Sequence, residues 1–212
     1  MSPTSLKTAF TVAVLWTLVA SAGDQSAERA IHTVFAQYKD ALLQGDGAKA
    51  AGVVSTRTIV FYDGIVTHAL KTPRTELNEL DFISKFMVLR IRHEFTKSEL
   101  SEMTGRKLLE RGVDRGWISK SSVANIDRLV NLEVDSSKAS AAIPSAPGIA
   151  AFHFLKESGE WKLDLAASFA LANAAMKQKI AKSGLTEEQF IIRALNLLSS
   201  TPVDDRIFAP QH

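Results

Sequence analysis

Apolar residues recur at helical spacing near the start of the chain, directly after Ser26, a residue type that often caps a helix. Gly45 predicts the end of this helix, because glycine tolerates the left-handed turn that closes many helices. Asp46 can then cap a short second helix. The apolar positions of the first helix are Ala27, Ala30, Ile31, Val34, Phe35, Tyr38, Ala41 and Leu42.

The spacing becomes strand-like after residue 57. Thr58–Tyr62 and Ile65–Leu70 are rich in β-branched and aromatic residues. They are separated by Asp63-Gly64, a pair that favours a two-residue hairpin turn. We therefore expect two antiparallel strands here, with His68 on their apolar face.

Two helices are expected in the middle of the chain. Residues 76–95 are apolar nearly all round a helical wheel, which predicts a largely buried helix, although Val88–Phe95 could instead form a strand. Thr96-Lys97-Ser98-Glu99 is a capping box, so another helix should cover about 97–111 and end at Gly112.

Four later segments alternate apolar and polar residues and predict antiparallel strands. The last two form a hairpin around Glu157-Ser158-Gly159. If Lys156 faces Glu160, His153 shares a face with Trp161. The four segments are Ile126–Val134, Lys138–Ile143, Ile149–Leu155 and Trp161–Ala166.

Two helices are expected after the last strand. Ser168–Lys182 has helical character and is followed by Gly184. Thr186-Glu187-Glu188-Gln189 is a second capping box, which opens Phe190–Leu198. Beyond Pro202 we expect a loose tail.

Residues 1–22 have the features of an export signal. Lys7 provides a positive start, Ala9–Ala20 is apolar, and Ala20-Ser21-Ala22 has the small residues of a cleavage site. The apolar run is too short for a membrane span, which needs roughly 20 residues. We expect cleavage before Gly23, no membrane span after it, and a periplasmic or secreted protein. The alternatives are an uncleaved anchor and a buried core helix.

Composition and charge narrow the possible functions. The chain has 212 residues, 46% of them hydrophobic, and a formal net charge of only +2. Such a weak field does not attract nucleic acid, so we expect no nucleic-acid partner. Without cysteine there is neither a disulfide nor a thiolate zinc site. Because the five histidines are scattered and no phosphate-binding or nucleophile motif is present, we expect no metal and no cofactor.

Two stretches share a pattern with a known superfamily. In Ala30–Gly64, a long helix, a Gly-Asp-Gly break and a short helix precede Phe61-Tyr62-Asp63-Gly64. In Phe152–Leu165 (FHFLKESGEWKLDL), a tryptophan follows a polar turn that contains glycine. Both resemble the nuclear-transport-factor-2-like superfamily, also called the cone-shaped α+β fold. The resemblance implies a curved antiparallel sheet wrapped around the long N-terminal helix, with a pocket at the open end.

We expect one domain, because the sequence shows no internal repeat, low-complexity tract or linker. Residues 23–200 form a single α+β domain, and 201–212 form a tail. The chain adds helices to the superfamily plan, in the middle at about 97–120 and at the C-terminal end over 168–199. Members of the superfamily include ketosteroid isomerases, polyketide-cyclase-like enzymes and non-catalytic binding domains, so fold alone does not choose the function.

His68 and His153 are the candidates for a catalytic acid or base. Each is expected on the apolar face of a hairpin, and histidine titrates near neutral pH. The alternative for each is a hydrogen-bonded histidine of the core or its rim.

Four other residues are candidates for ligand binding. Tyr38 and Tyr62 are the only tyrosines, and the hydroxyl of Tyr38 could reach a cone interior. Arg90 lies on a flank of the buried helix, where it could line a pocket or cover apolar surface with its stem. Arg128 alternates with apolar neighbours, so we expect it to point inward, where its guanidinium needs a carboxylate or an anion.

These observations favour an exported, non-catalytic domain that binds a small apolar or carbonyl-containing ligand or interacts with another protein. A homodimer through the sheet is a further expectation. The alternative is an isomerase- or cyclase-type enzyme that removes a proton next to a carbonyl. It would use His68 or His153 as the base, and Tyr38 or Arg128 to stabilise the developing charge.

Overall fold

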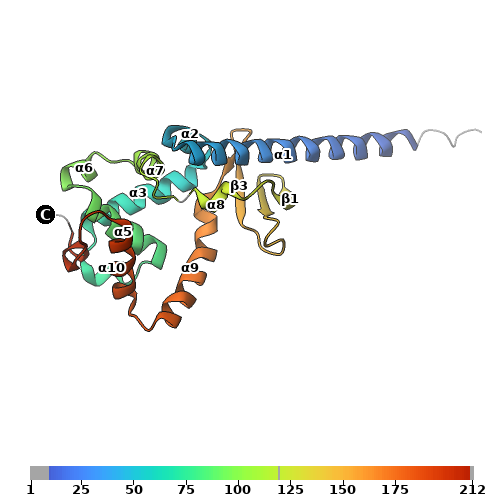
Figure 1. The fold of residues 1–212 in the computed structure, drawn as a ribbon. Coiled ribbons are helices and arrows are strands. Elements are labelled where there is room, and N and C mark those ends of the chain that lie inside the picture. Colours follow the sequence, from blue (N-terminus) through green and yellow to red (C-terminus); the bar gives the residue numbers. More distant parts are fainter. Residues whose placement is uncertain (1–9, 119, 211–212) are drawn as a thin grey trace, which may run out of the picture.

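The computed structural model describes residues 10–118 and 120–210. It has an α+β fold in which helices precede and follow an antiparallel sheet (Figure 1). The helices before the sheet are α1 (Phe10–Gln44), α2 (Gly47–Val53), α3 (Thr56–Lys71), α4 (Arg74–Leu77), α5 (Phe82–Glu94), α6 (Lys97–Ser101), α7 (Gly105–Asp114) and α8 (Ser121–Ala124). The strands and the later helices are β1 (Val130–Asp135), β2 (Lys138–Ala142), β3 (Phe152–Glu157), β4 (Glu160–Leu163), α9 (Leu165–Ser183), α10 (Glu187–Leu198) and the 3-10 helix η1 (Asp205–Phe208).

Helix α1 contains the predicted first helix but begins much earlier, at Phe10. It runs without a break through Ala20-Ser21-Ala22 and ends before Gly45, which has a φ of +72° as a left-handed closing residue should. Figure 1 shows the N-terminal part of α1 projecting past the sheet. Lys7 lies outside the described residues, and removal of the leader stays a prediction. No helix in the described part is long and apolar enough to cross a membrane.

The predicted first hairpin is wrong, because residues 56–71 form helix α3. The Ser55 side chain starts this helix by accepting a hydrogen bond from the Thr58 amide. Asp63-Gly64 therefore lies inside a helix and not in a turn. The residues before it, which the superfamily resemblance implies to be a strand, are helical as well. The buried positions of α3 follow helical spacing: Thr58, Tyr62, Ile65, Val66 and Ala69.

Side-chain caps divide both middle helices more finely than predicted. Asp81 accepts a hydrogen bond from the Ser84 amide and separates α4 from α5, which is helical throughout and has no strand. The capping box at Thr96 is confirmed, but it opens only the short α6. Thr104 caps a new helix, α7, and Gly112 lies inside α7 instead of ending it.

The sheet is a meander in the order β1-β2-β3-β4, with every neighbouring pair antiparallel. The predicted final hairpin is confirmed, but Lys156 pairs with Trp161 and not with Glu160. A one-residue difference in register moves every side chain to the other face of a sheet. Phe154 and Leu163 consequently face the core together, while His153 lies on the opposite face from Trp161.

Strand β1 begins at Val130, later than predicted, and Arg128 is exposed in the segment that precedes it. The inward orientation predicted for Arg128 is therefore wrong. The prediction fails because side chains alternate between two faces only in residues that are part of a strand, and Arg128 is not. In this unpaired segment Ile126 and Leu129 are the buried residues.

Helix α3 is fastened to the end of the sheet at Ser55 and Asp164. The Ser55 amide donates to the Leu163 carbonyl over 2.8 Å, and its hydroxyl donates to the Asp164 carboxylate over 3.3 Å. Arg57 forms an ion pair with the same carboxylate, at 3.1 Å. Because Asp164 is buried, these partners are what makes its charge tolerable there.

Helix α7 lies in backbone contact with two other helices, at Gly105 and Gly47. A Cβ atom on Gly105 would stand 2.3 Å from the Ile59 carbonyl oxygen of α3. The Gly105 amide donates a hydrogen bond to the carboxylate of Asp63, also in α3. A Cβ atom on Gly47 would stand 2.1 Å from the Glu110 carbonyl oxygen of α7. Glycine is thus required for both helix contacts.

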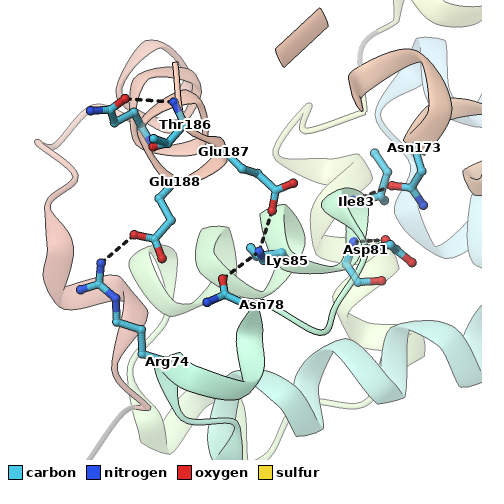
Figure 2. Close-up of polar contacts among 11 residues, drawn as sticks. Arg74, Asn78, Asp81, Ile83, Lys85, Asn173, Thr186, Glu187 and Glu188 are labelled. Atoms are coloured by element: carbon cyan, nitrogen blue, oxygen red, sulfur yellow. Dashed lines mark hydrogen bonds and ion pairs between the residues drawn. The ribbon is translucent and has the colours of Figure 1, made fainter. Parts of the chain in front are cut away.

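The start of α10 is fastened to α4 and α5 by charged side chains, as Figure 2 shows. The buried Lys85 ammonium contacts Glu187 at 2.6 Å and donates to Asn78 over 3.3 Å. At the surface, Arg74 pairs with Glu188 at 2.7 Å. The predicted capping box at Thr186 is confirmed at the same helix end.

The prediction of a loose tail beyond Pro202 is wrong, because Val203, Ile207 and Phe208 are buried. The guanidinium of Arg92, in α5, donates to the carbonyl oxygens of Ile207 and Phe208 over 3.3 and 3.0 Å. It also donates to the last carbonyls of α3. A buried arginine thus fastens the tail to two helices.

Gly105→Ala should lower the free energy of unfolding by about 1–3 kcal/mol, because the new methyl group meets the backbone of α3. Gly64→Ala is the matched control, since it adds a methyl group to α3 where no atom lies within 4 Å. It should raise stability by about 0.5–1 kcal/mol through helix propensity. Urea denaturation measures both, and equal effects of the two variants would contradict the close packing at Gly105.

Glu187→Ala should cost about 1–3 kcal/mol of stability, because it leaves the buried Lys85 ammonium with Asn78 as its remaining partner. Glu188→Ala removes only an exposed pair with Arg74 and should cost less than about 1 kcal/mol. Adding Lys85→Met to Glu187→Ala should recover most of the loss. Chemical denaturation tests this order, and a double variant no more stable than Glu187→Ala would refute the account.

Candidate functional site

An apolar pocket of about 210 Å³ lies among α3, α5, α7 and the segment after α7. Its lining includes the buried Ile91, Leu108 and Leu109 and the half-buried Phe86 and Met87. No carboxylate and no histidine is among the lining residues. The lining residues are Tyr62, Ile83, Phe86, Met87, Arg90, Ile91, Leu108, Leu109, Gly112, Trp117 and Ile118.

Helix α5 supplies one continuous stripe of this lining. Its residues stand at positions i, i+3, i+4, i+7 and i+8, which lie on one face of a helix. The opposite face of α5 packs into the core through Val88, Leu89 and Arg92. The stripe consists of Ile83, Phe86, Met87, Arg90 and Ile91.

The end of α7 turns Trp117 back toward the pocket. Gly116 has a φ of +67°, and its amide donates to the Val113 carbonyl over 2.9 Å. The Trp117 amide donates to the Gly112 carbonyl over 2.8 Å. These two bonds make a Schellman motif, which needs a residue such as glycine in the left-handed region. The motif places the indole beside Gly112.

Arg90 brings a positive charge to this apolar lining. Only 9% of the residue is exposed, and its guanidinium carbon lies 4.4 Å from the centre of the Trp117 ring. In the part of the chain that the structure describes, Arg90 Nε has no hydrogen-bond partner. Burial lowers the pKa of Arg90, and the nearby Glu94 carboxylate opposes that shift.

The charge of Glu94 is shared with Arg115, at 3.4 Å. The Arg115 guanidinium lies 4.6 Å from the centre of the Phe95 ring and 5.7 Å from that of Trp117. The indole of Trp117 therefore lies within cation–π distance of two arginines, Arg90 and Arg115.

Tyr62 supplies the pocket's hydroxyl group. Its side chain is buried, and burial raises its pKa well above the ordinary value. The phenol is therefore protonated at neutral pH. The same holds for Tyr38, whose pKa is raised by burial and by Tyr62, but Tyr38 does not line the pocket.

Comparisons of the chain with protein-family models, with curated proteins and with solved structures find no match.

Of the predicted ligand-binding residues, the structure brings Tyr62 and Arg90 together in one pocket. Tyr38 is buried in the core on α1, and Arg128 is exposed next to the sheet. Of the four candidates, Tyr62 and Arg90 therefore line the pocket, and Tyr38 and Arg128 do not.

The two predicted catalytic histidines lie elsewhere. His68 is near the end of α3, where its Nδ1 and the Thr72 hydroxyl are 2.9 Å apart. His153 lies on the outer face of β3, in a separate hollow with Glu133, Asp135 and Lys138. Neither lines the apolar pocket. Within the described residues, no group of three or more histidine and carboxylate side chains could hold a metal ion.

The sequence prediction missed the α7 side of the pocket, which includes Leu108, Leu109, Trp117 and Ile118. One local signal could have found Trp117. Gly116 follows a helical stretch that a glycine in the left-handed region can close in a Schellman motif, and the closing turn directs the next residue, Trp117, back toward α7. Placing that motif across from α5 needed the tertiary structure.

Proposed function

We propose that this protein binds a small, largely apolar molecule in the pocket between α5 and α7, without catalysing a reaction on it. The observation that carries the proposal is an apolar lining with a few polar groups, the arrangement typical of ligand pockets. An apolar cavity of about 150 Å³ can hold benzene, so this pocket has room for roughly eight to ten non-hydrogen atoms.

The isomerase or cyclase alternative has less support. It needs a base and a hydrogen-bond donor in the same cavity. The pocket offers donors in Tyr62 and Arg90, but its lining includes neither His68 nor His153. We therefore favour binding over proton abstraction.

The cone-shaped arrangement is part of the same proposal. Contacts of α1 with β4 and β1, and a distance of 4.9 Å between the ring centres of Phe35 and Phe152, support a sheet that curves around α1. The helical α3 weighs against the first half of the resemblance to the nuclear-transport-factor-2-like superfamily, and the hairpin of Phe152–Leu165 supports the second half.

A homodimer through the sheet is a further part of the proposal. Sedimentation equilibrium of the chain would test it, with a monomer at all concentrations as the result that excludes it.

1-Octanol should bind the full chain, because its tail matches the size and polarity of the pocket, and binding should change the fluorescence of Trp117. Gly112→Leu fills the pocket beside Trp117 without a close contact, since its Cβ atom would lie 3.7 Å from the indole. It should weaken binding by about tenfold or more. Calorimetric titration measures the affinity.

Gly52→Leu is the matched control for this test, because Gly52 is exposed on α2 with no atom within 4 Å of its Cβ position. It should leave binding unchanged. No binding of 1-octanol to the wild type, or equal binding by Gly112→Leu, would exclude the pocket as the site.

The export part of the proposal rests on Lys7, the apolar run and Ala20-Ser21-Ala22. When the protein is expressed in a bacterial host, it should be recovered outside the cytoplasm. Its mass should be that of a chain whose first residue is Gly23. Ala22→Arg should block cleavage, because the site needs a small residue there, whereas Ser21→Ala should not. Intact-mass spectrometry distinguishes these forms, and an uncut wild-type chain would refute the export signal.

A further inference from the structure

We infer that the ligand of the apolar pocket is a small carboxylic acid, an aliphatic or aromatic acid of about ten non-hydrogen atoms, whose carboxylate binds Arg90. This inference rests on the proposed function and adds the chemical class of the ligand. It follows from the surroundings of one guanidinium group.

Two neighbouring arginines of α5 are both buried, but only one has its nitrogen atoms satisfied within the fold. Arg92 Nε donates to the Ala69 carbonyl, and its terminal nitrogens donate to the carbonyls of His68, Thr72, Ile207 and Phe208. Arg90 Nε has no such partner in the described part of the chain. A buried donor left without a partner costs free energy. Arg90 is thus the buried cation of α5 whose donors the described part of the fold does not fully satisfy.

The fold holds Arg90 in place without using its Nε donor. The guanidinium packs over the Trp117 ring, at 4.4 Å, and this contact uses the face of the group and not its N–H edge. Glu94, which stands four residues later on α5, pairs with Arg115. Within the described residues, no acceptor of the fold takes a hydrogen bond from the Arg90 guanidinium, which lines the pocket.

The chemistry of that acceptor follows from the charge and shape of the lining. A guanidinium edge matches a planar carboxylate, and a charged acceptor gives the stronger hydrogen bond. The lining supplies one cation, Arg90, which suits a singly charged group. The rest of the lining is apolar and fits a hydrocarbon tail or an aromatic ring.

The size of the pocket sets the length of the tail. With room for roughly eight to ten non-hydrogen atoms, it fits octanoate or a phenyl-substituted short acid, and a long-chain acid would extend beyond it. Octanoate and 1-octanol are a nearly isosteric pair that differs in the charged head group, so their comparison isolates the effect of Arg90.

The test is calorimetric titration of the full chain with octanoate and with 1-octanol. The wild type should bind octanoate about tenfold more tightly than 1-octanol, or better, because only the acid forms a charge-assisted hydrogen bond with Arg90. Arg90→Met keeps an unbranched apolar stem but removes the charged guanidinium, and it should bind the two ligands with similar affinity. Arg111→Met, which removes an exposed arginine of α7, should keep the preference for octanoate.

The outcomes separate the two proposals. If 1-octanol binds as tightly as octanoate, or if Arg90→Met keeps the preference for the acid, the carboxylate inference is wrong while the binding pocket stands. If neither ligand binds the wild type, the proposed function itself fails. Should Arg90→Met not fold, the Arg90 Nε–H resonance of the wild type decides: octanoate should shift it and 1-octanol should not, and equal shifts would overturn the inference.

Discussion

The close approach of α7 to α3 and α2 is the constraint on which the pocket depends. It is possible because the two contact points are glycines, Gly105 and Gly47, where any Cβ atom would overlap a backbone carbonyl of the neighbouring helix. At one of these points the Asp63 carboxylate also accepts the Gly105 amide. With α7 held this near, Leu108 and Leu109 face α5 across a narrow apolar space.

Helix α5 forms the other wall, and its two buried arginines do different things. Arg92 serves the fold: its hydrogen bonds reach the end of α3 and the C-terminal tail, and burial lowers its pKa to about 10. It therefore stays charged at neutral pH and keeps all its donors. Arg90, on the pocket side, is packed against Trp117 and has a donor to offer. The same residue type thus supports the structure on one face of α5 and the proposed site on the other.

Local signals predicted parts of the fold well. The capping boxes at Thr96 and Thr186 form as expected, because both partners of a capping box lie within one helical turn. The final hairpin also forms at its Ser158-Gly159 turn. Asp63-Gly64 shows the opposite case. The pair reads as a turn, but burial of Tyr62, Ile65 and Val66 on a common helical face outweighs the local turn preference.

The sequence by itself determined the capping boxes at Thr96 and Thr186, the end of the first helix at Gly45, the antiparallel strands and the choice of Tyr62 and Arg90 as candidates. Tertiary structure decided the helical state of α3, the register that puts His153 outside, the docking of the tail and the union of Tyr62, Arg90 and Trp117 in one pocket. The physical reason is the distance along the chain over which each interaction acts. A cap or a tight turn depends on neighbours a few residues apart, whereas burial and close helix contact depend on residues far apart in the chain, which periodicity does not bring together.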